Sequence, residues 1–353
     1  MNLSKGEFME EQLRIFFLEA GYYVLRGAKY KYEGLDVTDV DLFLYARPSG
    51  TIRHRINVDI KNKRSPQAFE RILWANGLKQ LLRFDGCMVA TTDKKKNVSE
   101  FARKHDTTIL DGDFLSKVKS LPINERIVEE ELTSALAQHK SYKTFANKDW
   151  RKIYEESKSR LLSEMDYSGL NTLLATLRYF LEKVLVDEQK RIHAIRMAYI
   201  LSSYILITLD YILKDISFSD IKERELQISN GLKFGNLGAD GTDKLLSIIS
   251  KISGPRASNQ FYKSLDSIQD DMFREFFARN ENANNLFLWA RKFENIGFSK
   301  TITVPDEIDS QLKGVLAILI DYCGIERKRF FSAFESNAQL DLKIVEEKNK
   351  TVG

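Results

Sequence analysis

The stretch that decides the fold is TDVDLFLYARPSGTIRHRINVDIK, residues 38–61. Its second half alternates apolar and polar residues, which is the pattern of a β-strand. Between the two apolar runs, residues 47–50 read Arg-Pro-Ser-Gly, with proline and glycine at the second and fourth places that favour a tight turn. The stretch therefore predicts a β-hairpin whose strands lie near residues 41–46 and 52–60.

Two carboxylates are expected to meet in this hairpin. Asp41 and Asp59 are equidistant from Gly50, so folding about the turn sets the start of one strand beside the end of the next. Unpaired, the two would repel, and a divalent cation resolves the conflict; Mg²⁺ (or Mn²⁺) suits hard oxygen ligands, with the Ile60 carbonyl as a candidate third. By the strand period Lys61 shares the face of Asp59, where its ammonium would orient a water or offset charge on a phosphate.

A third acid is expected from the helix predicted over residues 5–20. Glu10 shares a helical stripe with Leu13, so its carboxylate lies on the buried side, where a charge is costly without a partner. Glu11, one position on, is predicted to be a solvated charge. Taken alone, Glu10 could instead pair with Arg14 on the helix surface.

The chain shows two patterns along its length. Residues 1–118 alternate short β-like runs with helical ones, which predicts an α/β layer with a mixed sheet. Beyond KSLPINER, residues 119–126, apolar residues recur at helical spacing. We predict an α/β domain over residues 1–120 and an all-α domain over 121–353, the latter for partner binding, oligomerisation or nucleic-acid recognition. Besides the hairpin, the predicted elements are helices over 5–20, 66–83 and 97–105 and strands near 22–26, 86–91 and 107–110.

Composition limits the class of protein. The 353 residues are 43% apolar, enough to build real cores, and the net charge is +4. The basic excess lies in the first third, because residues 1–120 carry a net charge of +5 and the remainder −1. This distribution suits a face that binds a polyanion, and a solvated surface with a few spare lysines would give the same count. Two cysteines and four scattered histidines argue against a cysteine-based zinc site and a zinc hydrolase.

Neither export nor membrane insertion is expected, and we predict a cytoplasmic protein. The N-terminus lacks an apolar signal core, and the longest apolar run, residues 197–213, is interrupted by Asp210, which predicts a buried helix. The Gly/Asn-rich residues 229–243 match neither G-x-x-x-x-G-K-[ST] nor G-x-G-x-x-G. They are predicted to form a mobile loop between helices.

The order of these motifs resembles a known family. Glu10 on a helix, then GYYV (21–24), TDVDLF (38–43) and DIK (59–61), is similar to the PD-(D/E)xK phosphodiesterases, which have the restriction-endonuclease-like fold. The next stretch, LKQLLRFDGCMVATTDKKKNVSEFARKHDTTILDGDFL, residues 78–115, resembles the Mrr-like branch of bacterial restriction enzymes. The resemblance covers about residues 5–116 and implies a metal-dependent endonuclease.

The resemblance also implies a set of site residues. Val40 stands where the family name has proline, and the second acid is Asp where Mrr-like members more often carry Glu or Gln. Asp39 is second choice to Asp41, and Lys79 is second choice to Gln80, which falls where related enzymes often carry a polar helix residue. The implied residues are Glu10, Asp41, Asp59, Lys61 and Gln80, with Asp41, Asp59 and the Ile60 carbonyl as metal ligands.

Two functions of different classes follow. The first is a Mg²⁺-dependent DNA endonuclease, in a prokaryotic restriction or anti-phage defence system; RNA is a further candidate substrate because the phosphodiester chemistry is shared. The second is a non-catalytic nucleic-acid-binding or scaffold protein that reuses the fold. Because an acid-x-Lys triplet occurs eight times in the chain, residues 59–61 carry weight only together with Asp41 and Glu10.

Overall fold

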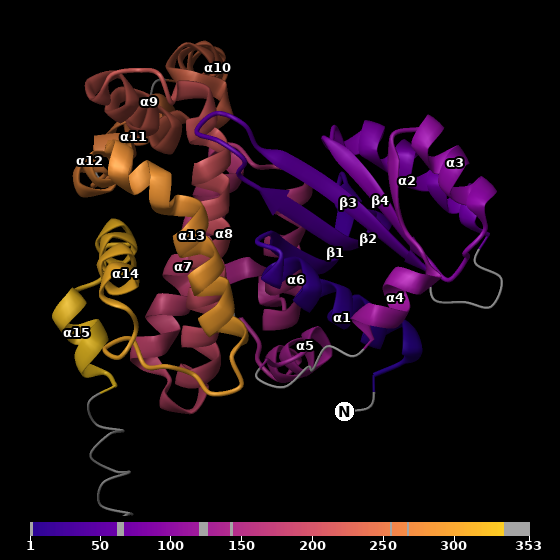
Figure 1. The fold of residues 1–353 in the computed structure, drawn as a ribbon. Helices are drawn as coiled ribbons and strands as arrows, with labels where there is room; N and C mark the ends of the chain where they lie inside the picture. The colour runs from indigo at the N-terminus through magenta and orange to yellow at the C-terminus, as the bar shows by residue number, and fades with distance from the viewer. Residues whose placement is uncertain are drawn as a thin grey trace, which may run out of the picture. The chain divides into compact units, whose positions relative to one another are not determined.

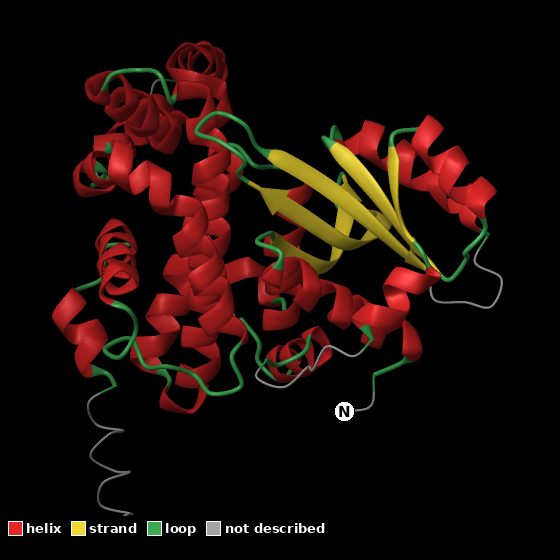
Figure 2. Ribbon diagram, viewed as in Figure 1, coloured by secondary structure: helices red, strands yellow, loops and turns green. Residues whose placement is uncertain are grey.

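The chain folds into two compact units. The structure, a computed structural model, describes residues 3–61, 67–119, 126–141, 144–254, 256–266 and 268–334. Unit 1 comprises Met1–Met165 with Tyr211–Ser217, and unit 2 comprises Asp166–Asp210 with Phe218–Gly353. Unit 1 holds the sheet and unit 2 is helical, as Figures 1 and 2 show.

A five-stranded mixed sheet forms the centre of unit 1, in the order β1-β2-β3-β4-β5. The first three strands pair antiparallel, whereas β3–β4 and β4–β5 are parallel. Parallel neighbours require crossover connections, and helices supply them here. The predicted α/β part with a mixed sheet is therefore confirmed. The strands are β1 (Tyr23–Tyr32), β2 (Leu35–Ala46), β3 (His54–Lys61), β4 (Gly86–Thr91) and β5 (Thr107–Leu110).

The β2–β3 hairpin has the register that its sequence predicts. Leu42 lies opposite Val58, as a fold about residue 50 requires, although β3 begins at His54, two residues later than expected. Strands β1 and β2 are both longer than predicted, because they continue to a two-residue turn at Glu33 and Gly34. Both turn residues have positive φ, which is the geometry of the favoured two-residue hairpin loop.

Helices cover both faces of the sheet (Figure 1). On one face α1 (Lys5–Glu19) and α4 (Gly112–Val118) pack on the sheet through a core that includes Leu13, Leu42 and Val58. On the other, α2 (Ala68–Leu82) and α3 (Lys96–Lys104) pack around Ile72 and Val89. Because both faces of β3 are buried, its polar residues need partners from the helices.

Unit 1 extends past the predicted boundary at residue 120. Helices α5 (Glu129–Ala137) and α6 (Trp150–Ser163) belong to it. The Lys158 ammonium donates to the Arg26 carbonyl at 2.9 Å, and the Ser159 hydroxyl donates to the Lys29 carbonyl. Helix α6 thereby satisfies carbonyls of the edge strand β1, which would otherwise invite pairing with another chain.

Helices make up unit 2, as predicted for the second part of the chain. One expectation here is wrong: residues 229–243 are largely helical rather than a loop. Gly231 lies where an added Cβ would be 2.1 Å from the ring of Tyr167, and Gly235 and Gly238 have positive φ at the break between two helices. The glycines therefore serve close packing and a sharp corner. The helices of this region are α7 (Tyr167–Val186), α8 (Arg191–Leu213), α9 (Ile221–Phe234), α10 (Gly238–Ser253), α11 (Arg256–Asp266), α12 (Asp271–Ala278), α13 (Asn280–Phe298), α14 (Ser310–Tyr322) and α15 (Arg327–Ser332), with short 3-10 turns at Glu188–Lys190 and Gly235–Leu237. Two further 3-10 turns, Thr144–Asn147 and Lys214–Ile216, belong to unit 1.

The most apolar helix is a buried one, as predicted. The segment Glu188–Ile216, which contains α8, is long and apolar enough to cross a membrane by length and composition alone. Of its most apolar window, 89% is buried inside the fold. This burial is consistent with the core helix of a soluble protein.

Candidate active site

Asp41 and Asp59 flank the last residue pair of the β2–β3 hairpin, Leu42 opposite Val58. Extending the register of Leu42 opposite Val58 by one residue sets these two aspartates opposite each other. The Ile60 amide donates to Oδ2 of Asp41 at 2.6 Å, which fixes this carboxylate against the neighbouring strand. Directly opposed residues in a sheet point to the same face. The observed pairing ends one residue short of the two aspartates, so their juxtaposition follows from the register and stays a prediction.

Asp41 is set in a largely buried position. Burial raises the pKa of its carboxyl, and the Ile60 N–H and the positive charges of Arg71 and Lys61 act in the opposite direction. Lys61, the last residue of β3, is therefore within electrostatic reach of Asp41. A further positive charge near Asp41 would lower its pKa and favour the ionised carboxylate over the protonated one.

Asp59 is engaged by an arginine that the sequence does not reveal. Arg71, in the first turn of α2, donates from Nε to Oδ2 of Asp59 at 2.6 Å. Its second nitrogen, Nη2, pairs with Oδ1 of the same carboxylate. Both oxygens of Asp59 thus face one guanidinium, the two-pronged geometry that arginine favours with carboxylates. The only sequence signal is a basic residue near the start of the helix after the strand, a common feature.

The side chain of Glu10 on α1 is half-buried, and its partner is Arg26 of β1. Arg26 Nε donates to Oε2 of Glu10 at 3.0 Å. Burial raises the pKa of Glu10; the Arg26 charge opposes the rise and the Asp41 charge adds to it. Glu10 and Asp41 are therefore in electrostatic contact. The alternative pairing of Glu10 with Arg14 is wrong, because Arg14 bonds Glu11.

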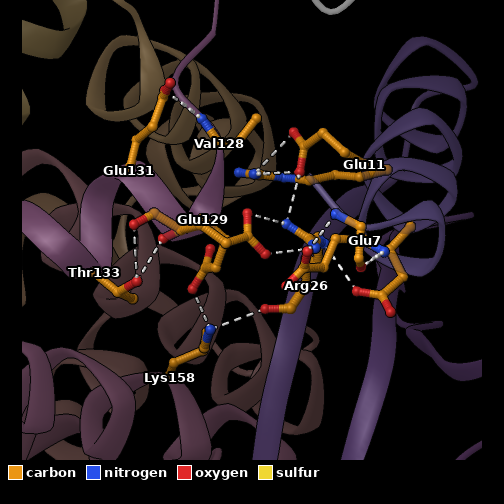
Figure 3. Close-up of polar contacts among 12 residues, drawn as sticks. Glu7, Glu11, Arg26, Val128, Glu129, Glu131, Thr133 and Lys158 are labelled. Carbon is orange, nitrogen blue, oxygen red and sulfur yellow. Dashed lines mark hydrogen bonds and ion pairs between the residues drawn. The ribbon is translucent and has the colours of Figure 1, made fainter. Parts of the chain in front are cut away.

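The prediction that Glu11 is solvated is also wrong, because its side chain is fully buried. It belongs to a network of charges that Figure 3 shows around Arg26. Arg26 donates to Glu11 at 3.4 Å and binds both oxygens of Glu130 from α5, at 2.8 and 2.9 Å. Next to it, Lys158 of α6 pairs with Glu129 of α5. The network joins α1, β1, α5 and α6, so its first role is structural.

The structure does not bring Gln80 to the carboxylates. Gln80 is exposed near the C-terminal end of α2, nine residues after Arg71, or roughly 13 Å along a helix. Its neighbour Lys79 lies at the same end. Asp39 is exposed two residues before Asp41 on β2, where its charge helps to raise the pKa of Asp41.

The carboxylate oxygens of Asp41 and Asp59 are the type of ligand that Mg²⁺ prefers. Mg²⁺ is usually held by one or two carboxylates and keeps several waters, and Asp41 and Asp59 supply two carboxylates from adjacent strands. The Ile60 amide contacts Asp41, while nothing in the described contacts tests its carbonyl as a ligand. Across the described part of the chain, no group of three or more His, Cys, Asp or Glu is placed to hold a metal ion. The cation that balances Asp59 is the Arg71 guanidinium.

The likeness to PD-(D/E)xK phosphodiesterases therefore rests on the order of motifs along the chain. Comparisons of the chain with protein-family models, with curated proteins and with solved structures found no match.

Proposed function

We propose that unit 1 is a divalent-metal-dependent endonuclease that hydrolyses DNA phosphodiester bonds. The observation that carries this proposal is the pair of aspartates on neighbouring strands, Asp41 on β2 and Asp59 on β3. The Ile60 amide fixes Asp41, and Lys61 ends the strand that holds Asp59. The order of motifs that resembles the PD-(D/E)xK family supports it, as does the net charge of +5 over residues 1–120.

The proposed chemistry divides among a few groups. Asp41 and Asp59 would hold Mg²⁺ or Mn²⁺, which when bound supplies Lewis-acid charge and lowers the pKa of a coordinated water. The Lys61 ammonium orients the attacking water or balances the negative charge that develops on the phosphate. Glu10, held by Arg26, adds negative charge near Asp41. Unit 2 would recognise nucleic acid, bind a partner or join two copies, in a cytoplasmic defence system.

The test is cleavage of supercoiled plasmid by the full chain with Mg²⁺ or Mn²⁺, with an EDTA control and a parallel RNA substrate. We expect metal-dependent nicking that Asp59→Asn abolishes. Asp220→Asn is the matched control: Asp220-Ile221-Lys222 repeats the tripeptide in unit 2, where Asp220 caps α9 by accepting from the Glu223 amide at 3.0 Å. Asparagine caps helices about as well as aspartate. Cleavage that persists in Asp59→Asn would overturn the assignment.

A second candidate, a nucleic-acid-binding scaffold, is favoured by the counter-charges. Arg71 on Asp59 and Arg26 on Glu10 already neutralise two of the proposed acids within the protein. In that case the chain would bind DNA in EDTA and cleave neither DNA nor RNA with either metal. Fluorescence anisotropy beside the nicking assay separates the two functions.

A further inference from the structure

We infer that Arg71 is a positioning residue of the aspartate pair and that it competes with a divalent ion for Asp59. The inference rests on the proposed metal site and specifies how metal enters it. Arg71 holds Asp59 in place while no metal is bound, and its guanidinium must leave at least one oxygen of Asp59 when metal binds.

The contacts of Asp59 carry this inference. Each oxygen of Asp59 contacts a different nitrogen of Arg71: Oδ2 accepts from Nε at 2.6 Å, and Oδ1 pairs with Nη2. The guanidinium therefore occupies the side of the carboxylate that a ligated ion would need. Charge gives the second reason. A guanidinium and a divalent cation on the same carboxylate repel each other strongly where water is scarce.

Arg71 also has a way out. Its side chain is 23% exposed, whereas that of Asp59 is 8% exposed. Arg71 stands in the first turn of α2, so its long side chain can rotate toward solvent while the helix stays in place. Asp41 is held separately by the Ile60 amide and keeps its position during the exchange.

The alternative is an ordinary ion pair that anchors the start of α2 to the end of β3. The two roles differ in a quantity that can be measured. A purely structural pair sets the melting temperature and leaves the affinity for metal unchanged or lowers it through disorder. A competing pair sets both, in opposite directions: its removal lowers the melting temperature of the metal-free protein and tightens metal binding.

The experiment is titration of the full chain with Mn²⁺, followed by calorimetry and by the electron paramagnetic resonance of free Mn²⁺. We expect Arg71→Gln to bind Mn²⁺ roughly tenfold more tightly than the wild type. Its metal-free melting temperature should fall and its Mn²⁺-induced rise should grow. Arg71→Lys keeps the charge without the two-pronged contact and should lie between. Arg103→Gln, an exposed arginine on α3, is the control and should match the wild type.

The location of the ion is tested by Asp59→Asn in the Arg71→Gln background, which should abolish the gain. Competition is overturned if Arg71→Gln binds Mn²⁺ as tightly as the wild type or more weakly. The metal site itself stands in either case, provided that Asp41→Asn abolishes binding. If no variant binds Mn²⁺ at millimolar concentration, the metal site fails and the inference with it. Should Arg71→Gln fail to fold, Arg71→Lys decides by the same criterion.

Discussion

Arg71 and Arg26 each supply a counter-charge to one acid of the candidate site. Their presence is what local sequence reasoning misses. The turn and the strand pattern predict that Asp41 and Asp59 lie opposite each other, but the identity of a cation arriving from a helix depends on tertiary packing. The position of Gln80 could not be predicted either. The length of α2 sets its distance from Asp59, and the number of residues between the two in the sequence does not. The strand pattern sets faces and neighbours; it does not set ion pairs across layers.

Substitution of Lys61 distinguishes a role in catalysis from a role in DNA binding. A lysine that acts on the transition state should affect the rate and leave the affinity largely intact. We expect Lys61→Ala to keep most DNA affinity and to lose about 10²-fold or more in single-turnover cleavage rate. Lys222→Ala, in the second Asp-Ile-Lys triplet, is the control and should cleave normally. A variant that cleaves at the wild-type rate but binds DNA more weakly would assign Lys61 to the phosphate backbone.

Between elements, the buried charges around Arg26 and Lys158 explain why α5 and α6 belong to unit 1. The sequence shows these helices as part of a helical region, and periodicity alone cannot tell which unit they join. Glu129 and Glu130 stand in the first turn of α5 and look like helix-start acids, yet they meet Lys158 and Arg26. Glu130 lies 104 residues from Arg26, and Glu129 lies 29 residues from Lys158. Partners so far apart in sequence leave no local pattern.

Glu129 gives a stability prediction with a pH dependence. Burial alone would raise the pKa of Glu129, but the charge of Lys158, with that of Arg14, holds it below its ordinary value. A lowered carboxyl pKa contributes stability that is present above the unfolded pKa and lost as pH falls through the folded one. We expect Glu129→Gln to cost about 3 kcal/mol at pH 7, because Lys158 is left buried and unpaired. The difference from wild type in urea unfolding should shrink as pH falls below about 4.5.

The matched control is Glu155→Gln, which removes the pair between half-buried Glu155 and exposed Arg151 on α6. It should cost about 0.5 kcal/mol or less, with little pH dependence. Equal costs for the two variants at pH 7 would show that the buried pair has no special weight.

Gly231 tests the helical assignment of residues 229–243. A Cβ there would meet the Tyr167 ring at 2.1 Å, so Gly231→Ala should destabilise the protein by about 1–3 kcal/mol. Gly314, also inside a helix of unit 2, has open space around it. Gly314→Ala should therefore stabilise by up to about 1 kcal/mol, as alanine does in a helix interior. Thermal melts that order the two variants the other way would contradict this packing.

For the molecule as a whole, composition and periodicity predict an α/β part followed by helices, and this division is observed. The boundary is less predictable, because unit 1 runs to Met165 and adds Tyr211–Ser217. Within it, Tyr211 lies over the Arg55 guanidinium, with 4.7 Å from Arg55 Cζ to the ring centre. The chain leaves unit 1 after Met165 and returns to it over Tyr211–Ser217, within a region that is helical throughout. Composition does not mark these crossings, so the sequence places the boundary near residue 120, where the composition first changes.

Fragments give the corresponding prediction. A fragment of residues 1–120 lacks Glu130 and Lys158, so Arg26 loses its two-pronged partner and β1 loses the cover of α6. We expect it to melt without cooperativity or to aggregate, whereas residues 1–165 should give a cooperative transition in circular dichroism. A cooperative 1–120 fragment with the melting temperature of 1–165 would restore the boundary at residue 120.

Whether Asp41 and Asp59 together hold a divalent ion can be seen directly by anomalous X-ray scattering from crystals grown with Mn²⁺. We expect one anomalous peak at roughly 2.0–2.4 Å from an oxygen of each carboxylate. Arg71 should then be turned away from at least one oxygen of Asp59. Crystals with no peak there at saturating Mn²⁺, and with Arg71 still on both oxygens of Asp59, would contradict this expectation.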